Sequence, residues 1–246
     1  MKMLLLSGLG LLLRLPTLGQ TAAPDTSLSA ATTGMRQQYA RALRDESSLY
    51  SGPAYVNYVR PGTKGHRFFE SAEDQPATIT YGGVTYRGVR ARYDLVRDQL
   101  VLSAQSGTLD LSLVNEQVAR FTLAGHTFVR LVGDSAVGLP ERPTFYDLLV
   151  PGPVRLLAAY RKKYSEGLEG SRIVSDITAR TDYFIQQGAR SYPVSKLGDV
   201  LRLFPKQRAA LRDYAQANDL HFDEDGRAAA LVALVRQQAT LSAAPN

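Results

Sequence analysis

Apolar and polar residues alternate with a period of two through the middle of the chain, from residue 54 to about residue 193. In the run from Val89 to Leu95, every second residue is apolar and the residues between them are charged. A second run, from Leu109 to Leu113, places leucine at every other position. Alternation of this kind is typical of antiparallel strands that have one face against a core and the other in water.

Short turn signals separate these runs and allow consecutive strands to pair. Gly82 and Gly83 lie between two of the runs, and a type I′ turn requires a positive φ at both of its central residues. Strands joined by loops of two residues pair antiparallel. We therefore predict a meander of roughly eight to ten antiparallel strands, which forms a curved sheet or a partly closed barrel.

Two other stretches of the chain follow the helical period instead. Residues 34–47 carry apolar residues on one face with Arg and Gln opposite, which predicts one amphipathic helix ahead of the strands. Beyond the strands we expect three helices: the first is capped by Ser195, the second starts at Pro205, and the third runs from about Gly226 to Leu241. The predicted fold class is therefore α+β.

The segment from residue 154 to residue 164 fits both periods. Val154, Leu156, Ala158 and Tyr160 alternate as they would in a strand. The alanine and lysine content of the same segment would also suit a helix. The sequence leaves both interpretations open here.

The first residues of the chain have the order of a secretory signal. Lys2 provides a positive charge, residues 4–13 form an apolar run, and a small-residue stretch ends at Gly19. The apolar run is shorter than the roughly 20 residues that a membrane-spanning helix needs. We expect cleavage after Gly19, with Ala22 or Ala23 as alternatives, and export to the periplasm or the medium. A buried N-terminal helix is the alternative interpretation.

These patterns divide the chain into four parts. The signal peptide precedes a leader rich in Ala, Thr, Ser and Pro, then a helix with the antiparallel β domain, and last a C-terminal helical subdomain. The four parts cover residues 1–19, 20–33, 34–194 and 195–246. We expect no transmembrane segment after removal of the signal peptide.

Composition narrows the chemistry that is open to the protein. The chain contains no cysteine, which excludes disulfides, thiolate nucleophiles and zinc sites built on sulfur. It has 29 basic and 23 acidic residues, and its net charge of +6 is dispersed along the sequence. The one tight basic cluster, Arg161–Lys163, is interpreted as the solvated end of an element, so no nucleic-acid partner is expected.

Three motifs resemble catalytic or metal-binding sites, but each lacks the neighbouring residues or the spacing that such a site needs. Gly133–Ser135 has the form of a hydrolase serine motif, but it lacks the flanking residues and the base that such a serine needs. His66, His126 and His221 are far apart in the sequence, so they define no metal site. The acidic stretch that ends at Gly226 lacks the final glutamate of a calcium loop. We predict no catalytic residue, cofactor or metal ligand.

Tyrosines are the main candidates for a binding surface. Tyr55 and Tyr58 lie close together before the first strands, and Tyr81, Tyr86 and Tyr93 fall on successive predicted strands. Exported ligand-binding proteins use tyrosine as an amphipathic wall, so we take these five residues as candidate ligand-binding residues. Tyrosine is also common in strands, and packing in the core or at sheet edges is the alternative interpretation.

Loose aromatic and glycine spacings recur through the part of the chain that follows the signal. They are Tyr50–Tyr55, Gly65–Phe68, Tyr81–Val89, Arg92–Asp94 and Leu201–Tyr214. This pattern resembles uncharacterised secreted proteins of Bacteroidota-type bacteria. The resemblance implies export and a single fold unit. It implies no catalytic residue, because the family has no assigned activity.

Three functions remain in view. The first is a non-enzymatic envelope protein that binds an apolar or glycan ligand in its curved sheet, or binds another envelope protein. The second is a structural or assembly protein of the envelope. The third is a hydrolase whose carboxylates converge in one cleft with perturbed pKa values. Its candidate carboxylates are Asp94, Asp98, Asp134, Glu141 and Asp147.

Overall fold

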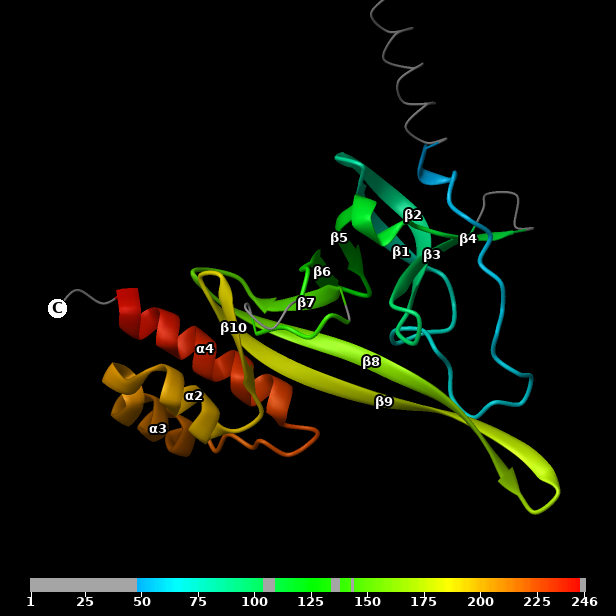
Figure 1. Cartoon of the computed structure of the whole chain (residues 1–246). Helices are drawn as coiled ribbons and strands as arrows, with labels where there is room; N and C mark the ends of the chain where they lie inside the picture. Colours follow the sequence, from blue (N-terminus) through cyan, green and yellow to red (C-terminus); the bar gives the residue numbers. More distant parts are fainter. Residues whose placement is uncertain (1–47, 104–108, 134–137, 143, 244–246) are drawn as a thin grey trace, which may run out of the picture. The chain divides into compact units, whose positions relative to one another are not determined.

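The computed structural model describes residues 48–103, 109–133, 138–142 and 144–243. This part of the chain is α+β, as predicted. Ten antiparallel strands form one sheet that does not close, and three α-helices follow it (Figure 1). The signal peptide, the leader and the amphipathic helix expected over residues 34–47 lie outside the described residues.

Two runs of consecutive strands make the sheet and meet where β5 pairs with β1. The first run comprises β1 (Gln75–Tyr81), β2 (Val84–Asp94), β3 (Gln99–Ser103) and β4 (Asp110–Ser112). The second run comprises β5 (Val118–Leu123), β6 (His126–Arg130), β7 (Phe145–Val150), β8 (Val154–Glu169), β9 (Arg172–Gln187) and β10 (Arg190–Val194). The strand order is therefore β10-β9-β8-β7-β6-β5-β1-β2-β3-β4.

This order departs from one uninterrupted meander after β4. The short 3-10 helix η1 (Asn115–Gln117) follows β4, and β5 then pairs with the edge of β1 that faces away from β2. The pairing places Phe121 opposite Ile79, and both side chains are fully buried. With a neighbour on each edge, β1 has both rows of its backbone groups paired and presents no open edge.

The predicted turn between β1 and β2 is confirmed. Gly82 and Gly83 have φ values of 56° and 83°, the positive values that both central positions of a type I′ turn require. Tyr81 and Val84 close the ladder on either side of them. Glycine is favoured at both positions because it adopts this backbone without steric cost.

Aromatic and aliphatic side chains together fill the face shared by β1, β2, β3, β5 and β6. Phe121 and Phe128 stack with ring centroids 4.7 Å apart, and Tyr93 meets Phe145 edge to face at 5.9 Å. Phe69, which precedes β1, packs against Phe128 at 5.1 Å. These rings bury one another, so the chain's own side chains occupy the face on which an apolar ligand was expected.

The ambiguous segment from residue 154 to residue 164 is a strand. It forms the first part of β8, which pairs with β9 along all 16 residues, from Val154 opposite Gln187 to Glu169 opposite Arg172. Pairing with β7 on the other side buries its apolar residues, and this decides against a helix. Beyond the reach of β7 and β10, β8 and β9 continue together as a long two-stranded hairpin (Figure 1).

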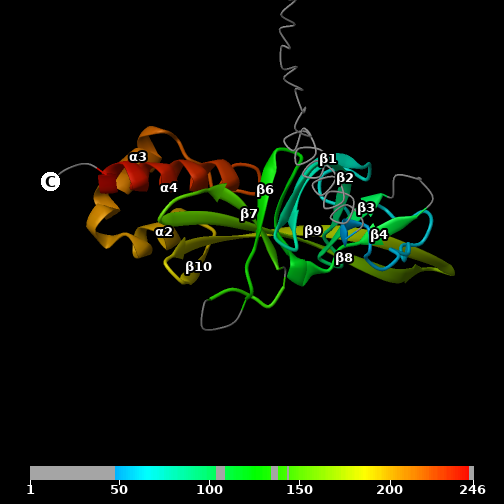
Figure 2. The same ribbon diagram turned by 90° about the horizontal axis from the view of Figure 1, so that it is seen from above.

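The three predicted C-terminal helices are present, but the N-cap of the first is Lys196 and not Ser195 as expected. They are α2 (Leu197–Leu203), α3 (Arg208–Ala217), which follows the 3-10 helix η2 (Pro205–Gln207), and α4 (Arg227–Ala243). The predicted apolar stripe of α4 is buried, from Ala230 to Val235. Together with Leu156 of β8 and Ile185 of β9, this stripe forms a second core. The helices lie at the end of the sheet formed by β7–β10, away from β1–β4 (Figure 2).

Candidate functional site

Tyr55 and Tyr58, two of the candidate binding residues, donate to one buried carboxylate. The Tyr55 hydroxyl lies 2.5 Å from Oδ2 of Asp94, and the Tyr58 hydroxyl lies 2.8 Å from the same oxygen. The backbone N–H groups of Val96 and Arg97 donate to Oδ1 at 2.8 and 3.0 Å. Asp94 is fully buried, so these donors replace the water that its charge would otherwise need.

Arg67 completes this group, which we call the Asp94 network (Tyr55, Tyr58, Arg67 and Asp94). Its Nε donates to the Tyr55 hydroxyl at 2.7 Å and lies 3.7 Å from Oδ2 of Asp94. Burial, reinforced by the charge of Asp94, raises the pKa of both tyrosines well above the ordinary value, so both remain neutral donors. The carboxylate has its donors within the chain, and the network fastens the segment before β1 to the end of β2.

The other three candidate tyrosines belong to the aromatic core. Tyr81 and Tyr93 are buried, and Tyr86 is half-buried against the same cluster. The Tyr93 hydroxyl donates to Oδ1 of Asp98 at 2.6 Å. The structure therefore brings Tyr55 and Tyr58 together, and it places Tyr81, Tyr86 and Tyr93 in core packing rather than beside them on one surface.

Asp98 is the centre of a second buried group. Besides the Tyr93 hydroxyl, it accepts hydrogen bonds from the backbone N–H and the hydroxyl of Thr144, both at 2.8 Å. Burial raises the pKa of Asp98 above its ordinary value, and the hydrogen bonds oppose this rise only in part. These contacts hold the start of β7 against the turn between β2 and β3.

Asp147 takes part in a third group, with a histidine. Nδ1 of His126 lies 2.6 Å from Oδ2 of Asp147, and the Tyr160 hydroxyl donates to the same oxygen at 3.1 Å. An acid that orients a histidine is typical of a catalytic triad. Here Nε2 of His126, where such a base would meet its nucleophile, lies 3.3 Å from Oε1 of Glu70. A carboxylate at this position gives no nucleophile for acyl transfer.

Among the described residues, the carboxylates proposed for a hydrolase belong to separate groups. Asp94, Asp98 and Asp147 are each held by their own partners, and Glu141 is exposed. Asp134 lies outside the described residues. Within the described part of the chain, no group of three or more His, Asp or Glu side chains is arranged to hold a metal ion.

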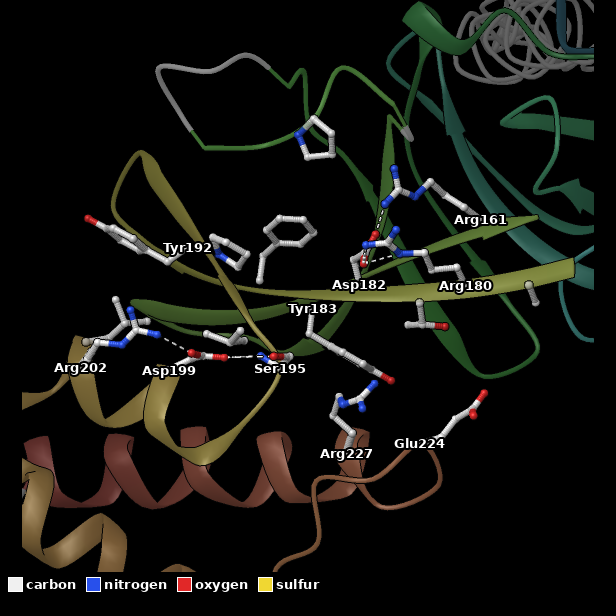
Figure 3. A pocket seen from close by; sticks show the side chains of 17 residues that line it. Arg161, Arg180, Asp182, Tyr183, Tyr192, Ser195, Asp199, Arg202, Glu224 and Arg227 are labelled. Atoms are coloured by element: carbon white, nitrogen blue, oxygen red, sulfur yellow. Dashed lines mark hydrogen bonds and ion pairs between the residues drawn. The ribbon is translucent and has the colours of Figure 1, made fainter. Parts of the chain in front are cut away.

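A pocket of about 1130 Å³ lies between β9, β10, α2 and the start of α4 (Figure 3). Aromatic side chains form part of its wall, namely Tyr183, Phe184 and Tyr192. Four arginines also line it: Arg161, Arg180, Arg202 and Arg227. The three acidic side chains of the lining are Asp182, Asp199 and Glu224. We call this feature the arginine pocket.

Two of these acids are already bound to arginines. Asp182 pairs with Arg161 across the hairpin and with Nη2 of Arg180 at 2.9 Å. Asp199 accepts from the backbone and hydroxyl of Ser195 at 2.9 and 3.1 Å, and from Nη2 of Arg202 at 2.5 Å. Asp182 and Asp199 therefore bind within the protein and offer little to a ligand, whereas the third acid, Glu224, is exposed.

Arg227 differs from the other arginines of the pocket. Its Nε donates to the carbonyl of Phe222 at 3.2 Å, and among the described residues no carboxylate lies within ion-pair distance of it. Its guanidinium lies next to the side chain of Tyr183 (Figure 3). Burial raises the pKa of Tyr183, and the charge of Arg227 opposes that rise. The far end of Arg227 can thus receive an anion.

Sequence reasoning did not find this pocket. Its parts come from β8, β9, β10, α2 and α4, and no motif joins them. The one available signal in the sequence is the basic cluster Arg161–Lys163, whose pattern predicts a solvated end of an element. Instead Arg161 pairs with Asp182, and Nζ of Lys162 donates to the carbonyls of His66 and Phe68 at 2.8 and 2.6 Å.

Comparison with known proteins adds no further identification. No protein-family model, curated protein or solved structure matches this chain. In the part that the structure describes, no helix is both long enough and apolar enough to cross a membrane.

Proposed function

We propose that this is an exported, non-catalytic binding protein of the cell envelope, and that it holds an anionic group of its ligand or partner in the arginine pocket. The observation that carries the proposal is the Arg227 guanidinium, which has no carboxylate partner among the residues that the structure describes and lies beside an aromatic wall. Arginine next to tyrosine recognises anions through charge-assisted hydrogen bonds and contacts their apolar parts through the ring. Export rests on the signal-like pattern of the first 19 residues.

Two other candidate regions of the molecule are less suited to binding. Aromatic side chains fill the sheet face on which an apolar ligand was expected. The buried carboxylate of Asp94 already accepts from two tyrosines and two backbone N–H groups. The arginine pocket is concave and about 1130 Å³ in volume, and its four arginines favour a ligand or segment that carries negative charge.

Mass spectrometry under native conditions tests this proposal. The protein, residues 20–246, would be purified without detergent from an envelope extract, and an added mass lost on denaturation would report a ligand. Arg227→Gln should remove that mass, because the neutral amide cannot neutralise an anion. Arg236→Gln is the matched control, since Arg236 is an exposed arginine of the same helix outside the pocket. No added mass, or equal retention by both variants, would show the proposal to be wrong.

One observation favours an assembly protein as the second candidate. Leu168 and Ile173 lie directly opposite each other near the tip of the β8–β9 hairpin, and they are 77% and 53% exposed. An apolar pair in this position suits a contact with another protein. Sedimentation analysis of the purified protein tests this, because Leu168→Thr together with Ile173→Thr should dissolve an assembly that depends on the tip.

A further inference from the structure

The outer edge of β9 is paired at both ends of a short open stretch. Toward the strand's end, β10 pairs with Tyr183–Gln187. Toward its start, the backbone N–H of Lys64 donates to the carbonyl of Ser175, and the N–H of Ile177 donates to the carbonyl of Lys64, both at 3.0 Å. No other described strand pairs with this edge over residues 178–182, which we call the open edge.

The register shows which backbone groups face outward along the open edge. In an antiparallel ladder, alternate residues direct both N–H and C=O to the same neighbouring strand. Ile177 directs its N–H away from β8 to Lys64, so Ala179 and Thr181 also direct their N–H and C=O groups away from β8. Both residues line the arginine pocket. An unpaired row of such groups is a template for another strand.

We propose that the ligand of the arginine pocket is an extended, acidic peptide segment of another protein, which pairs with β9 across Ala179 and Thr181. This inference rests on the proposed function and specifies its ligand. The open edge spans about 17 Å at the usual rise per residue, which suits a short strand. Strand addition of this kind takes its affinity from main-chain hydrogen bonds and its specificity from the pockets that receive alternate side chains.

The two faces of β9 explain why the peptide is acidic. Arg161, Arg180 and Asp182 lie on one face of the strand, and Tyr183 lies on the other, toward Arg227 (Figure 3). Alternate side chains of an added strand therefore meet the Asp182 ion pairs or Arg227. Within the described part of the chain, Arg227 is the one arginine of the pocket's four without a carboxylate partner. A Glu or Asp on that side of the peptide supplies the missing charge.

A second copy of the same chain is a poorer occupant of this edge. A symmetric antiparallel contact centred on the open edge would place Arg180 of one copy opposite Arg180 of the other. Like charges directly opposite each other destabilise a strand pair. The chain as a whole also carries a net charge of +6, which disfavours self-association at an arginine-lined edge.

Selection from a phage-displayed library of random linear peptides on residues 20–246 tests the inference. Enriched peptides should contain acidic residues and should bind Thr181→Pro at least about tenfold more weakly, because proline removes an outward N–H. The N–H of Thr181 does not serve the β8 ladder, so the variant should keep its circular dichroism spectrum and melting temperature. Arg227→Gln should weaken the same peptides, and Arg236→Gln should not.

Backbone methylation of a selected peptide provides the matched control on the ligand. N-methyl groups on the peptide amides that face β9 should abolish binding. N-methyl groups on the intervening amides should leave the affinity unchanged. Peptides that bind wild type and Thr181→Pro equally, or a failure to enrich any peptide, would overturn strand addition. A dimer that is lost in Thr181→Pro would assign the edge to a second copy and would also overturn it. A non-peptide mass that depends on Arg227 would overturn this inference while leaving the proposed function intact.

Discussion

The two ends of the sheet differ in whether their charged side chains have partners within the chain. At the end formed by β1–β6, the buried carboxylates of Asp94 and Asp98 accept from donors within the chain. At the end formed by β8–β10 and the helices, Arg227 keeps part of its guanidinium uncommitted in a pocket. Satisfied polar groups hold segments together, whereas an uncommitted charge in a concave surface is available to a ligand. The contrast separates the groups that stabilise this fold from those that we propose for recognition.

The largest expected effect is loss of the Asp94 network. Asp94→Ala leaves the hydroxyls of Tyr55 and Tyr58 without their acceptor and Arg67 without its counter-charge. We expect the free energy of unfolding to fall by about 3–5 kcal/mol, measured by urea denaturation. Glu116→Ala, at an exposed acidic residue of η1, should change it by less than about 0.5 kcal/mol. A small effect for Asp94→Ala would mean that the network is not what stabilises this end.

Changes in pH should have a smaller effect on the free energy of unfolding. The contributions of the two ends should change in opposite directions. Burial raises the pKa of Asp98 above 3.8, so the folded state holds this proton more tightly than the unfolded chain. Burial also acts to raise the pKa of Asp199, but hydrogen bonds from Ser195 and Arg202 outweigh it and lower the pKa below 3.8. As the pH falls, the contribution of Asp98 to stability therefore grows through its raised pKa. The contribution of Asp199, present above pH 3.8, is lost through its lowered pKa.

Two amide variants separate these contributions. The unfolding free energy of wild type minus that of Asp98→Asn should increase as the pH is lowered from about 6 to about 3. The difference between wild type and Asp199→Asn should decrease over the lower part of the same range. Denaturant unfolding at a series of pH values measures both differences. Changes of the same sign in both pairs would contradict the contrast between the two ends.

The smallest expected effect on stability is at Arg227. Arg227→Gln removes one hydrogen bond to the carbonyl of Phe222, so the free energy of unfolding should fall by no more than about 1 kcal/mol. Urea denaturation of this variant measures the change in the free energy of unfolding, with Arg236→Gln as the control. A loss as large as that of Asp94→Ala would make Arg227 a structural residue and remove the basis for its proposed role in binding.

Local patterns in the sequence predicted much of this fold. Gly82 and Gly83 identified their turn because few residues other than glycine tolerate two successive positive φ values. The stripe from Ala230 to Val235 identified the buried face of α4 because helical periodicity is set within the helix itself. Between residues 154 and 164 both periods fitted, and only pairing with β7 and β9 decided for a strand.

The site could not be predicted in the same way. Alternation from Val89 to Leu95 placed Asp94 among the polar residues of its strand, yet it is buried because Tyr55 and Tyr58 reach it from about 40 residues earlier. The arginine pocket joins Arg161 to Arg227 through tertiary packing alone. Interactions between distant segments leave no periodic trace in a single sequence, so they must be read from the structure.

One strand joins the separate clusters of the interior. In β8, Leu156 packs in the second core, beneath the helices, and Tyr160 packs against the aromatic core. Between them, Leu157 and Ala159 belong to a third cluster with Tyr146. Both cores contain residues of β8. Unfolding of either core would therefore remove packing contacts from this strand and destabilise the other core. A cooperative, single-step loss of structure follows, and a ligand that binds beside β9 would raise the melting temperature of both ends at once.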